Sequence, residues 1–237
     1  MYKRQILDIL FPKECVSCAK QGRYVCDKCQ GFISENALIC PVCHKASFGG
    51  KTHLECLGRH DLDGLVSIWD YDGVIKEAIH NIKYAGLFDM LKDLTKDAFK
   101  LISLDQSQRF DPFLTFLSQD NTYITYVPMF LKKERQRGFN QAKIISQEIA
   151  QKINKPAISL LEKIRETKDQ ASLIKEDRLQ NVKDSFVTSL AHELSSCKSC
   201  LLVDDVFTTG TTMQECCKVL KKSGIEKVWG FVLARAI

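Results

Sequence analysis

The fold is decided by residues 200–213, which read Cys-Leu-Leu-Val-Asp-Asp-Val-Phe-Thr-Thr-Gly-Thr-Thr-Met. The apolar run Leu201–Val203, bounded by polar residues, is typical of a buried strand in a parallel sheet. Asp204 and Asp205 stand at the carboxyl end of this strand, and the pattern that follows predicts a helix over 213–223. The order of strand, loop and helix therefore predicts an α/β protein with a parallel sheet.

The loop between that strand and helix has the residue types of a phosphate site. Gly210 permits a tight turn with inward N–H groups, and hydroxyl donors come from Thr208, Thr209, Thr211 and Thr212. The N-terminus of the following helix also favours an anion. Because two carboxylates suit vicinal hydroxyls, we expect a phosphorylated sugar as the ligand. A solvated turn with a capped helix would use the same residue types, but the complete order favours a ligand site.

Cysteines are concentrated near the N-terminus, where seven of the eleven precede residue 57. Pairs at two-residue spacing supply eight ligands, enough for two tetrahedral zinc ions: Cys15, Cys18, Cys26, Cys29, Cys40, Cys43, His53 and Cys56. Sequential pairing puts the first four on one ion, and an interleaved arrangement remains open. His44 and His60 are alternative zinc ligands to His53. A segment this short has few large apolar residues, so we expect structural zinc that supplies folding energy.

Composition and charge are those of an ordinary globular protein of 237 residues. Lys and Arg exceed Asp and Glu by 34 − 29 = 5, which does not by itself indicate nucleic-acid binding. No apolar run approaches the ~18 residues of a membrane helix, and residues 1–12 lack the pattern of a signal peptide. We therefore expect a cytoplasmic protein without membrane insertion, divided into a cysteine-rich zinc domain over 1–60 and a second domain over 61–237.

A second cluster of charge lies at 132–141, Lys-Lys-Glu-Arg-Gln-Arg-Gly-Phe-Asn-Gln. We interpret it as a cationic loop before a helix over 140–153, with Asn140 as the cap. Lys133, Arg135 and Arg137 would suit a pyrophosphate, although a solvated run of charges has the same composition.

The remaining periodicity completes the expected secondary structure. Strands are predicted over 63–71, 123–127, 158–165, 186–188 and 227–234. Helices are predicted over 1–14, after Pro112, and over 74–104 with a break near Gly86. The polar stretch 165–186 is typical of an active-site lid and includes a candidate helix at 174–181. Cys200 is expected to be a small core residue, although Cys197 and Cys200 have the spacing of a metal-ligand or redox pair, and Cys216 and Cys217 are expected to be core or surface thiols of a helix.

Two resemblances follow from these motifs. Residues 200–213 resemble the signature of the type I phosphoribosyltransferases, which have a Rossmann-like, mostly parallel sheet flanked by helices. Three further stretches resemble the ComF family of competence proteins: the cysteine-rich start, Arg135–Gln141, and Thr167 through Asn181. His53 departs from that family, which usually has a cysteine there.

The resemblance implies roles for individual residues. Asp204 and Asp205 would hold the ribose hydroxyls of phosphoribosyl pyrophosphate, and Thr208–Thr212 its 5-phosphate. Lys133, Arg135 and Arg137 would meet the pyrophosphate with Mg²⁺, and Arg178 would fold over as part of a lid. The resemblance further implies DNA uptake in natural transformation, with a helicase-like ATPase as a partner in some systems. Two classes of function remain: a phosphoribosyltransferase with an unknown acceptor, or a non-catalytic factor that binds single-stranded DNA or protein.

Overall fold

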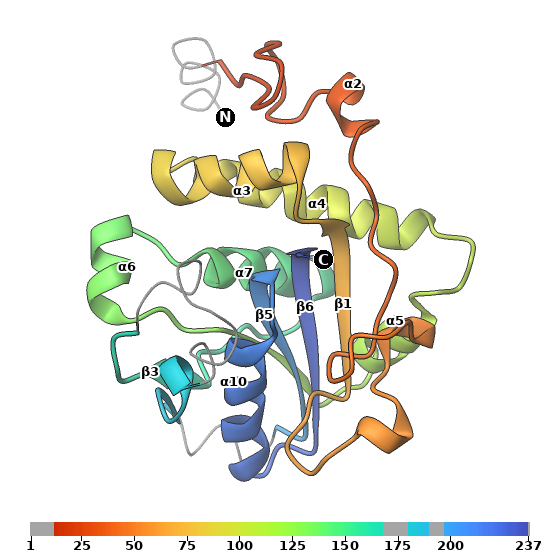
Figure 1. Ribbon diagram of the computed structural model, residues 1–237, viewed down its shortest axis with the longest axis vertical. Helices are drawn as coiled ribbons and strands as arrows, with labels where there is room; N and C mark the ends of the chain where they lie inside the picture. The colour runs from red at the N-terminus through yellow and green to blue at the C-terminus, as the bar shows by residue number, and fades with distance from the viewer. Residues whose placement is uncertain (1–11, 168–179, 190–196, 237) are drawn as a thin grey trace.

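Four parallel strands form the main sheet of the computed structural model, in the order β1-β6-β5-β2 (Figure 1). They are β1 Gly64–Asp70, β2 Thr122–Tyr126, β5 Ser199–Phe207 and β6 Lys227–Arg235. The structure describes residues 12–167, 180–189 and 197–236. The predicted helix over 1–14 and the candidate helix at 174–181 lie almost entirely outside these residues. The sheet and its flanking helices confirm the predicted α/β fold.

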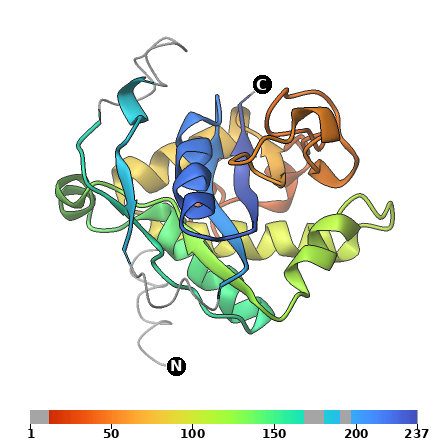
Figure 2. The same ribbon diagram turned by 90° about the horizontal axis from the view of Figure 1, so that it is seen from below.

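Side chains alternate between the two faces of the sheet, as the pleat of a strand requires. On β5, Leu201 and Val203 join the apolar cluster on one face, while Cys200 and Leu202 join the cluster on the other. The first face is covered by α3 Gly73–Ala85, α4 Phe88–Leu104, α5 Asp111–Leu117 and α7 Gln141–Ile153. The second face is covered by α10 Thr211–Lys222 and by the hairpin of β3 Leu161–Lys163 with β4 Phe186–Thr188 (Figure 2). This double cover explains why the strands are nearly all apolar.

Three predicted boundaries differ from the structure. The cationic stretch expected as a loop is the helix α6 Leu131–Arg137, because its residues are good helix formers and no glycine or proline interrupts them. Gly138, with φ +85°, ends that helix. β5 continues to Phe207, so Asp204 and Asp205 lie within its last residues, and α10 begins at Thr211. β3 has only three of the eight residues expected over 158–165. The predicted break at Gly86, with φ +70°, is confirmed.

The N-terminal part begins above α3 and α4 and then runs along the outer edge of β1 (Figure 1). Its regular elements are short: α2 Asp27–Gln30 and the 3-10 turns η1 Phe48–Gly50 and η2 Leu54–Cys56. The Asn36 N–H donates to the Ile68 carbonyl at 2.9 Å, and the Asp70 N–H donates to the Ser34 carbonyl at 3.0 Å. At the other end of β1, the Thr52 N–H donates to the Asp63 carbonyl at 3.0 Å. The edge of the sheet is therefore hydrogen-bonded to the cysteine-rich segment.

Within the described ranges, none of the helices has the length and apolar character needed to span a membrane.

Candidate ligand site and metal centres

A cavity of about 390 Å³ opens at the carboxyl end of β5, and we call it the β5 cavity. Its volume is in the range of small-molecule sites, and ligands of open α/β sheets bind at the carboxyl ends of strands. Five segments of the chain supply its lining: Tyr71, Lys83, Tyr84, Met129, Lys133, Arg137, Asp204–Thr208 and Gly210–Met213. Sequence positions more than a hundred residues apart therefore meet in one site.

The acidic pair lies on the floor of this cavity. Asp205 is 8% exposed, and its Oδ2 atom lies 2.8 Å from Nζ of Lys83, an ion pair without the angles of a good hydrogen bond. The Asp204 Oδ1 atom accepts a hydrogen bond of 2.9 Å from the Asp205 N–H. Burial, together with the charge of Asp205, raises the pKa of Asp204 to about 8. Asp204 is therefore a weaker acid than an ordinary aspartate, and Asp205 is held in an ion pair with Lys83.

The threonine loop forms one wall of the cavity. Gly210 has φ +75°, and a Cβ there would lie 2.4 Å from Cζ of Phe207, so both the backbone and the packing require glycine. Thr209 and Thr211 share a hydrogen bond of 2.5 Å between their hydroxyls. The N-cap of α10 is Gly210, which has no side chain to cap the helix, and the first N–H groups of a helix have no partners within it. This wall has the properties of an anion site.

Two cations of α6 face the loop. Lys133 and Arg137 line the β5 cavity, whereas Arg135 is exposed and lines a separate shallow depression with Phe130. Residues four apart share a helix face and residues two apart do not, so the unpredicted helix separates Arg135 from the other two. The Lys133 Nζ atom also donates to the Thr167 carbonyl at 3.3 Å. Arg178 lies outside the described residues.

Sequence reasoning did not assign Lys83, Tyr71 or Tyr84 to the site. Lys83 and Tyr84 stand just before Gly86, at the end of α3, and Tyr71 follows β1. The only signal was a lysine and a tyrosine next to a helix break, which is too common to identify a site. Their assignment depends on the ends of β1 and α3 reaching the carboxyl end of β5, although β6 lies between β1 and β5 in the sheet.

The first candidate metal centre brings together Cys15, Cys18, Cys26 and Cys29, whose sulfur atoms lie within 4.8 Å of one another. The Cys18 and Cys26 sulfurs are 3.6 Å apart, close to the ~3.8 Å edge of a tetrahedron with Zn–S bonds of ~2.3 Å. Burial would raise the pKa of Cys15, but N–H groups of Cys26, Cys18 and Ser17 outweigh it and lower that pKa to about 6. Four thiols gathered at these distances fit a zinc ion.

The second candidate centre brings together Cys40, Cys43, His53 and Cys56. His53 Nδ1 lies 3.4 Å from the Cys43 sulfur, and His53 Nε2 lies 3.1 Å from the Ala46 carbonyl. With its proton on Nε2, the ring donates to that carbonyl and turns the Nδ1 lone pair toward the thiols, as zinc requires. His44 instead contacts the Phe207 ring, with centroids 5.7 Å apart. Both groups follow the sequential pairing.

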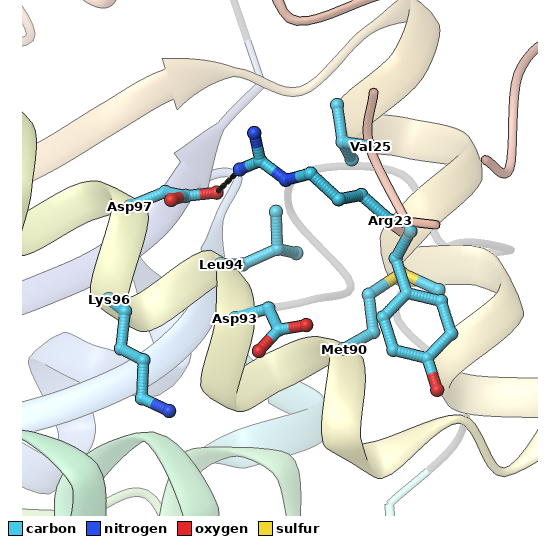
Figure 3. A pocket seen from close by; sticks show the side chains of 8 residues that line it. Arg23, Val25, Met90, Asp93, Leu94, Lys96 and Asp97 are labelled. Carbon is cyan, nitrogen blue, oxygen red and sulfur yellow. Dashed lines mark hydrogen bonds and ion pairs between the residues drawn. The ribbon is translucent and has the colours of Figure 1, made fainter. Parts of the chain in front are cut away.

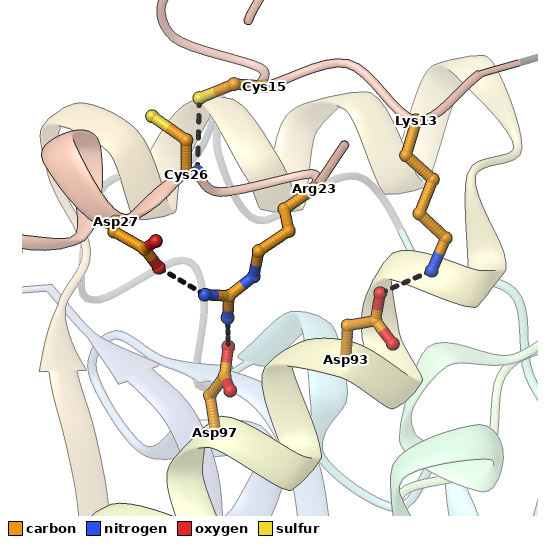
Figure 4. Close-up of polar contacts among 7 residues, drawn as sticks. All are labelled: Lys13, Cys15, Arg23, Cys26, Asp27, Asp93 and Asp97. Atoms are coloured by element: carbon orange, nitrogen blue, oxygen red, sulfur yellow. Dashed lines mark hydrogen bonds and ion pairs between the residues drawn. The ribbon is translucent and has the colours of Figure 1, made fainter. Parts of the chain in front are cut away.

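Charged contacts attach the first centre to α4. Arg23 pairs with Asp27 at 2.5 Å and with Asp97 of α4 at 3.5 Å, and Lys13 pairs with Asp93 of α4 at 2.7 Å (Figure 4). A cavity of about 180 Å³ lies under Arg23, and Met90 and Leu94 of α4 line it (Figure 3). These contacts hold the first candidate metal centre against α4.

Comparison with known proteins agrees with this architecture. Residues 136–236 match the family model "Phosphoribosyl transferase domain". The chain is 34% identical to Competence protein F of Haemophilus influenzae over 111 residues, 46% of this chain and 48% of that protein. It is 25% identical to DNA utilization protein YhgH of Escherichia coli K12, over 90% of this chain and 91% of that protein. It is 22% identical to Competence protein ComFC of Bacillus subtilis, over 92% and 86% respectively.

The fold, the domain match and the β5 cavity define a phosphoribosyltransferase-like protein. The cysteine groups and the relatives specify the family further. Together these findings support a phosphoribosyltransferase-like protein of the ComF type, in agreement with the resemblance of its motifs. The match to the Haemophilus protein spans only about half of that relative's length.

Proposed function

We propose that this protein binds phosphoribosyl pyrophosphate with Mg²⁺ in the β5 cavity and acts as a phosphoribosyltransferase in DNA uptake during natural transformation. One observation carries the proposal. The acidic pair, the threonine loop and two cations of α6 line the same cavity, although α6 lies about seventy residues before the loop in sequence. A phosphorylated sugar with a second anionic end needs these three kinds of partner.

Each part of the cavity suits one part of that ligand. The loop Thr208–Thr212 and the start of α10 would hold the 5-phosphate through N–H and hydroxyl donors. Asp204 and Asp205 would accept hydrogen bonds from the ribose hydroxyls. Lys133 and Arg137 would meet the pyrophosphate, and Arg178 remains a proposed lid residue. Arg135 has no place in this arrangement unless α6 moves.

The reaction would replace the bond between C1 of the ribose and the pyrophosphate with a bond between C1 and the nucleophile of an unknown acceptor, through an oxocarbenium-like state as in glycosyl transfer. The electron pair leaves with the pyrophosphate, so Lys133 and Arg137 stabilise a charge that grows during the reaction. The acidic pair fixes the ribose by its hydroxyls and offsets positive charge on the ring. Mg²⁺, bound with the pyrophosphate, would supply further neutralisation of the leaving group.

The biological role rests on the relatives. Two of them are named competence proteins and one a DNA utilization protein, and the similarity to the last extends over nine tenths of both chains. A helicase-like ATPase remains the expected partner from the family resemblance. Transformation frequency in a strain that carries ligand-site variants is the corresponding measurement.

The test is calorimetric titration of the full chain with phosphoribosyl pyrophosphate and Mg²⁺. The double variant Asp204→Asn with Asp205→Asn should lose two or more decades in affinity, since each removes charge-assisted hydrogen bonds worth ~1.5–3 kcal/mol. The amides preserve size, and a thermal melt checks the fold. Asp120→Asn, at an exposed position, is the matched control. Unchanged affinity in the folded double variant would remove the proposal.

A second function is favoured by the exposed aromatic rings on the cysteine-rich part. Phe32 is 72% exposed and Phe48 is 71% exposed, and lysines lie nearby in sequence at 28, 45 and 51. Rings beside cations are the usual platform for single-stranded nucleic acid. Titration with single-stranded DNA at several salt concentrations tests this function. Binding that falls steeply with salt and is lost in Phe48→Ala would support it, and salt-independent or absent binding would reject it.

A further inference from the structure

Lys83, in the described lining of the β5 cavity, forms an ion pair with the acidic pair. It projects from the last turn of α3, its side chain is 24% exposed, and its Nζ atom lies 2.8 Å from Asp205 Oδ2. Lys133 and Arg137 come from α6, on another side of the same cavity. Lys83 therefore neutralises Asp205 from outside the two segments to which ligand contacts were assigned.

Anchoring of α3 does not explain this lysine. The buried side chains of α3 already fix the helix on the sheet: Val74, Ile75, Ala78, Ile79 and Ile82. A partly buried ion pair gains little net stability, because removing two charges from water offsets their attraction. An ion pair in a cavity instead controls the direction and the charge of its partners. The location at Asp205 points to the ligand.

We propose that Lys83 is a positioning residue of the β5 cavity, which holds the Asp205 carboxylate toward the ligand and keeps the acidic pair negatively charged as ribose binds. The inference deepens the proposed function and rests on it for the identity of the ligand. Lys83 does not need to touch the reacting atoms. Its effect passes through Asp205 and, by charge, through Asp204.

The electrostatics agree with this geometry. Burial opposes the charge of Lys83, but the Asp205 carboxylate outweighs burial and the pKa of Lys83 is raised, so the side chain is a cation at neutral pH. In return, Lys83 opposes the burial and the Asp205 charge that raise the pKa of Asp204. The other titratable groups that act on this cluster by charge or line the cavity are Tyr71, Tyr84, Lys133, Arg137, Lys163 and Cys216. Loss of Lys83 should therefore leave Asp204 protonated to a higher pH.

Three variants of the full chain test the role. Lys83→Met keeps the length of the side chain without its charge, Lys83→Arg restores the charge, and Lys76→Met changes an exposed lysine of the same helix. For Lys83→Met we expect a tenfold or greater loss of affinity for phosphoribosyl pyrophosphate with Mg²⁺ at pH 7. The pH of half-maximal affinity should rise by about one unit, since a close opposite charge shifts a carboxyl pKa by ~1–3 units. Lys83→Arg should recover most of the loss, and Lys76→Met should match the wild type.

A second readout needs no ligand. Carbon NMR of labelled aspartate carboxyls should show the Asp204 titration moved to higher pH in Lys83→Met and not in Lys76→Met. If the wild type fails to bind phosphoribosyl pyrophosphate but this shift appears, the proposed function fails while Lys83 still sets the charge of the pair. An unchanged Asp204 titration, or unchanged affinity and pH profile in folded Lys83→Met, would overturn the inference.

Discussion

The Asp204→Asn substitution should stabilise the protein, and the gain should grow as the pH rises. Asp204 lies on the cavity floor, where burial and Asp205 raise its pKa to about 8, against ~3.9 for an unfolded chain. Between these values the folded state holds a proton that the unfolded state has released. Folding stability of the wild type therefore falls as pH rises through this window, whereas asparagine does not titrate.

The size of the effect follows from linkage. One proton of difference changes the free energy of unfolding by at most about 1.4 kcal/mol per pH unit, or about 3 kcal/mol between pH 5 and pH 7. Asp204 keeps some contact with solvent, which reduces the effect, so we expect a relative gain of about 1–2 kcal/mol for the variant. A ligand site that buries a carboxylate commonly reduces stability in this way.

Urea unfolding of wild type and Asp204→Asn at pH 5, 6, 7 and 8 measures this gain. Comparing the two chains at each pH cancels the titration of the cysteine groups, which both share. Asp120→Asn, at an exposed position, should show no trend. A difference between wild type and Asp204→Asn that stays constant with pH, or that reverses, would refute the burial argument.

Three further outcomes are expected. Metal analysis should find two zinc ions per chain and one in His53→Ala, because His53 completes the second group; two ions in the variant would remove His53 as a ligand. Arg137→Ala should weaken binding of phosphoribosyl pyrophosphate about tenfold and spare ribose 5-phosphate, while Arg135→Ala should change neither, as calorimetry would show. Gly210→Ala should destabilise the chain by about 1–3 kcal/mol in urea unfolding, since φ is +75° and the new Cβ meets Phe207; wild-type stability would contradict the required glycine.

The sheet and the loop were predictable because their signals are local. The apolar run before Asp204, the glycine at 210 and the periodicity of α3, α4 and α7 each appear within a few residues. The prediction of a loop at 132–137 was wrong because it relied on the charge of these residues. The same residues have high helix propensity, and they form α6. That error had a consequence for the site, because a helix turns Arg135 away from the face that carries Lys133 and Arg137.

Lys83 shows what sequence patterns cannot supply. Lys83 lies in helix α3 and its partner Asp205 lies in strand β5, so the pairing depends on the end of α3 reaching the carboxyl end of β5 in space. The reverse holds for the metal groups, where two-residue spacing places ligands together by local turns alone. Local chemistry was therefore readable from the sequence, and chemistry assembled by the sheet was not.

The position of β1 has a consequence for folding during synthesis. One edge of β1 bonds to residues 34–36 and 51–52, which leave the ribosome just before it, whereas the other edge pairs with β6 at the far end of the chain. Until β6 is made, the strand has only the cysteine-rich segment to cover its open hydrogen-bonding groups. Early zinc loading would thus shield the growing chain from pairing with neighbouring chains until β6 has been made.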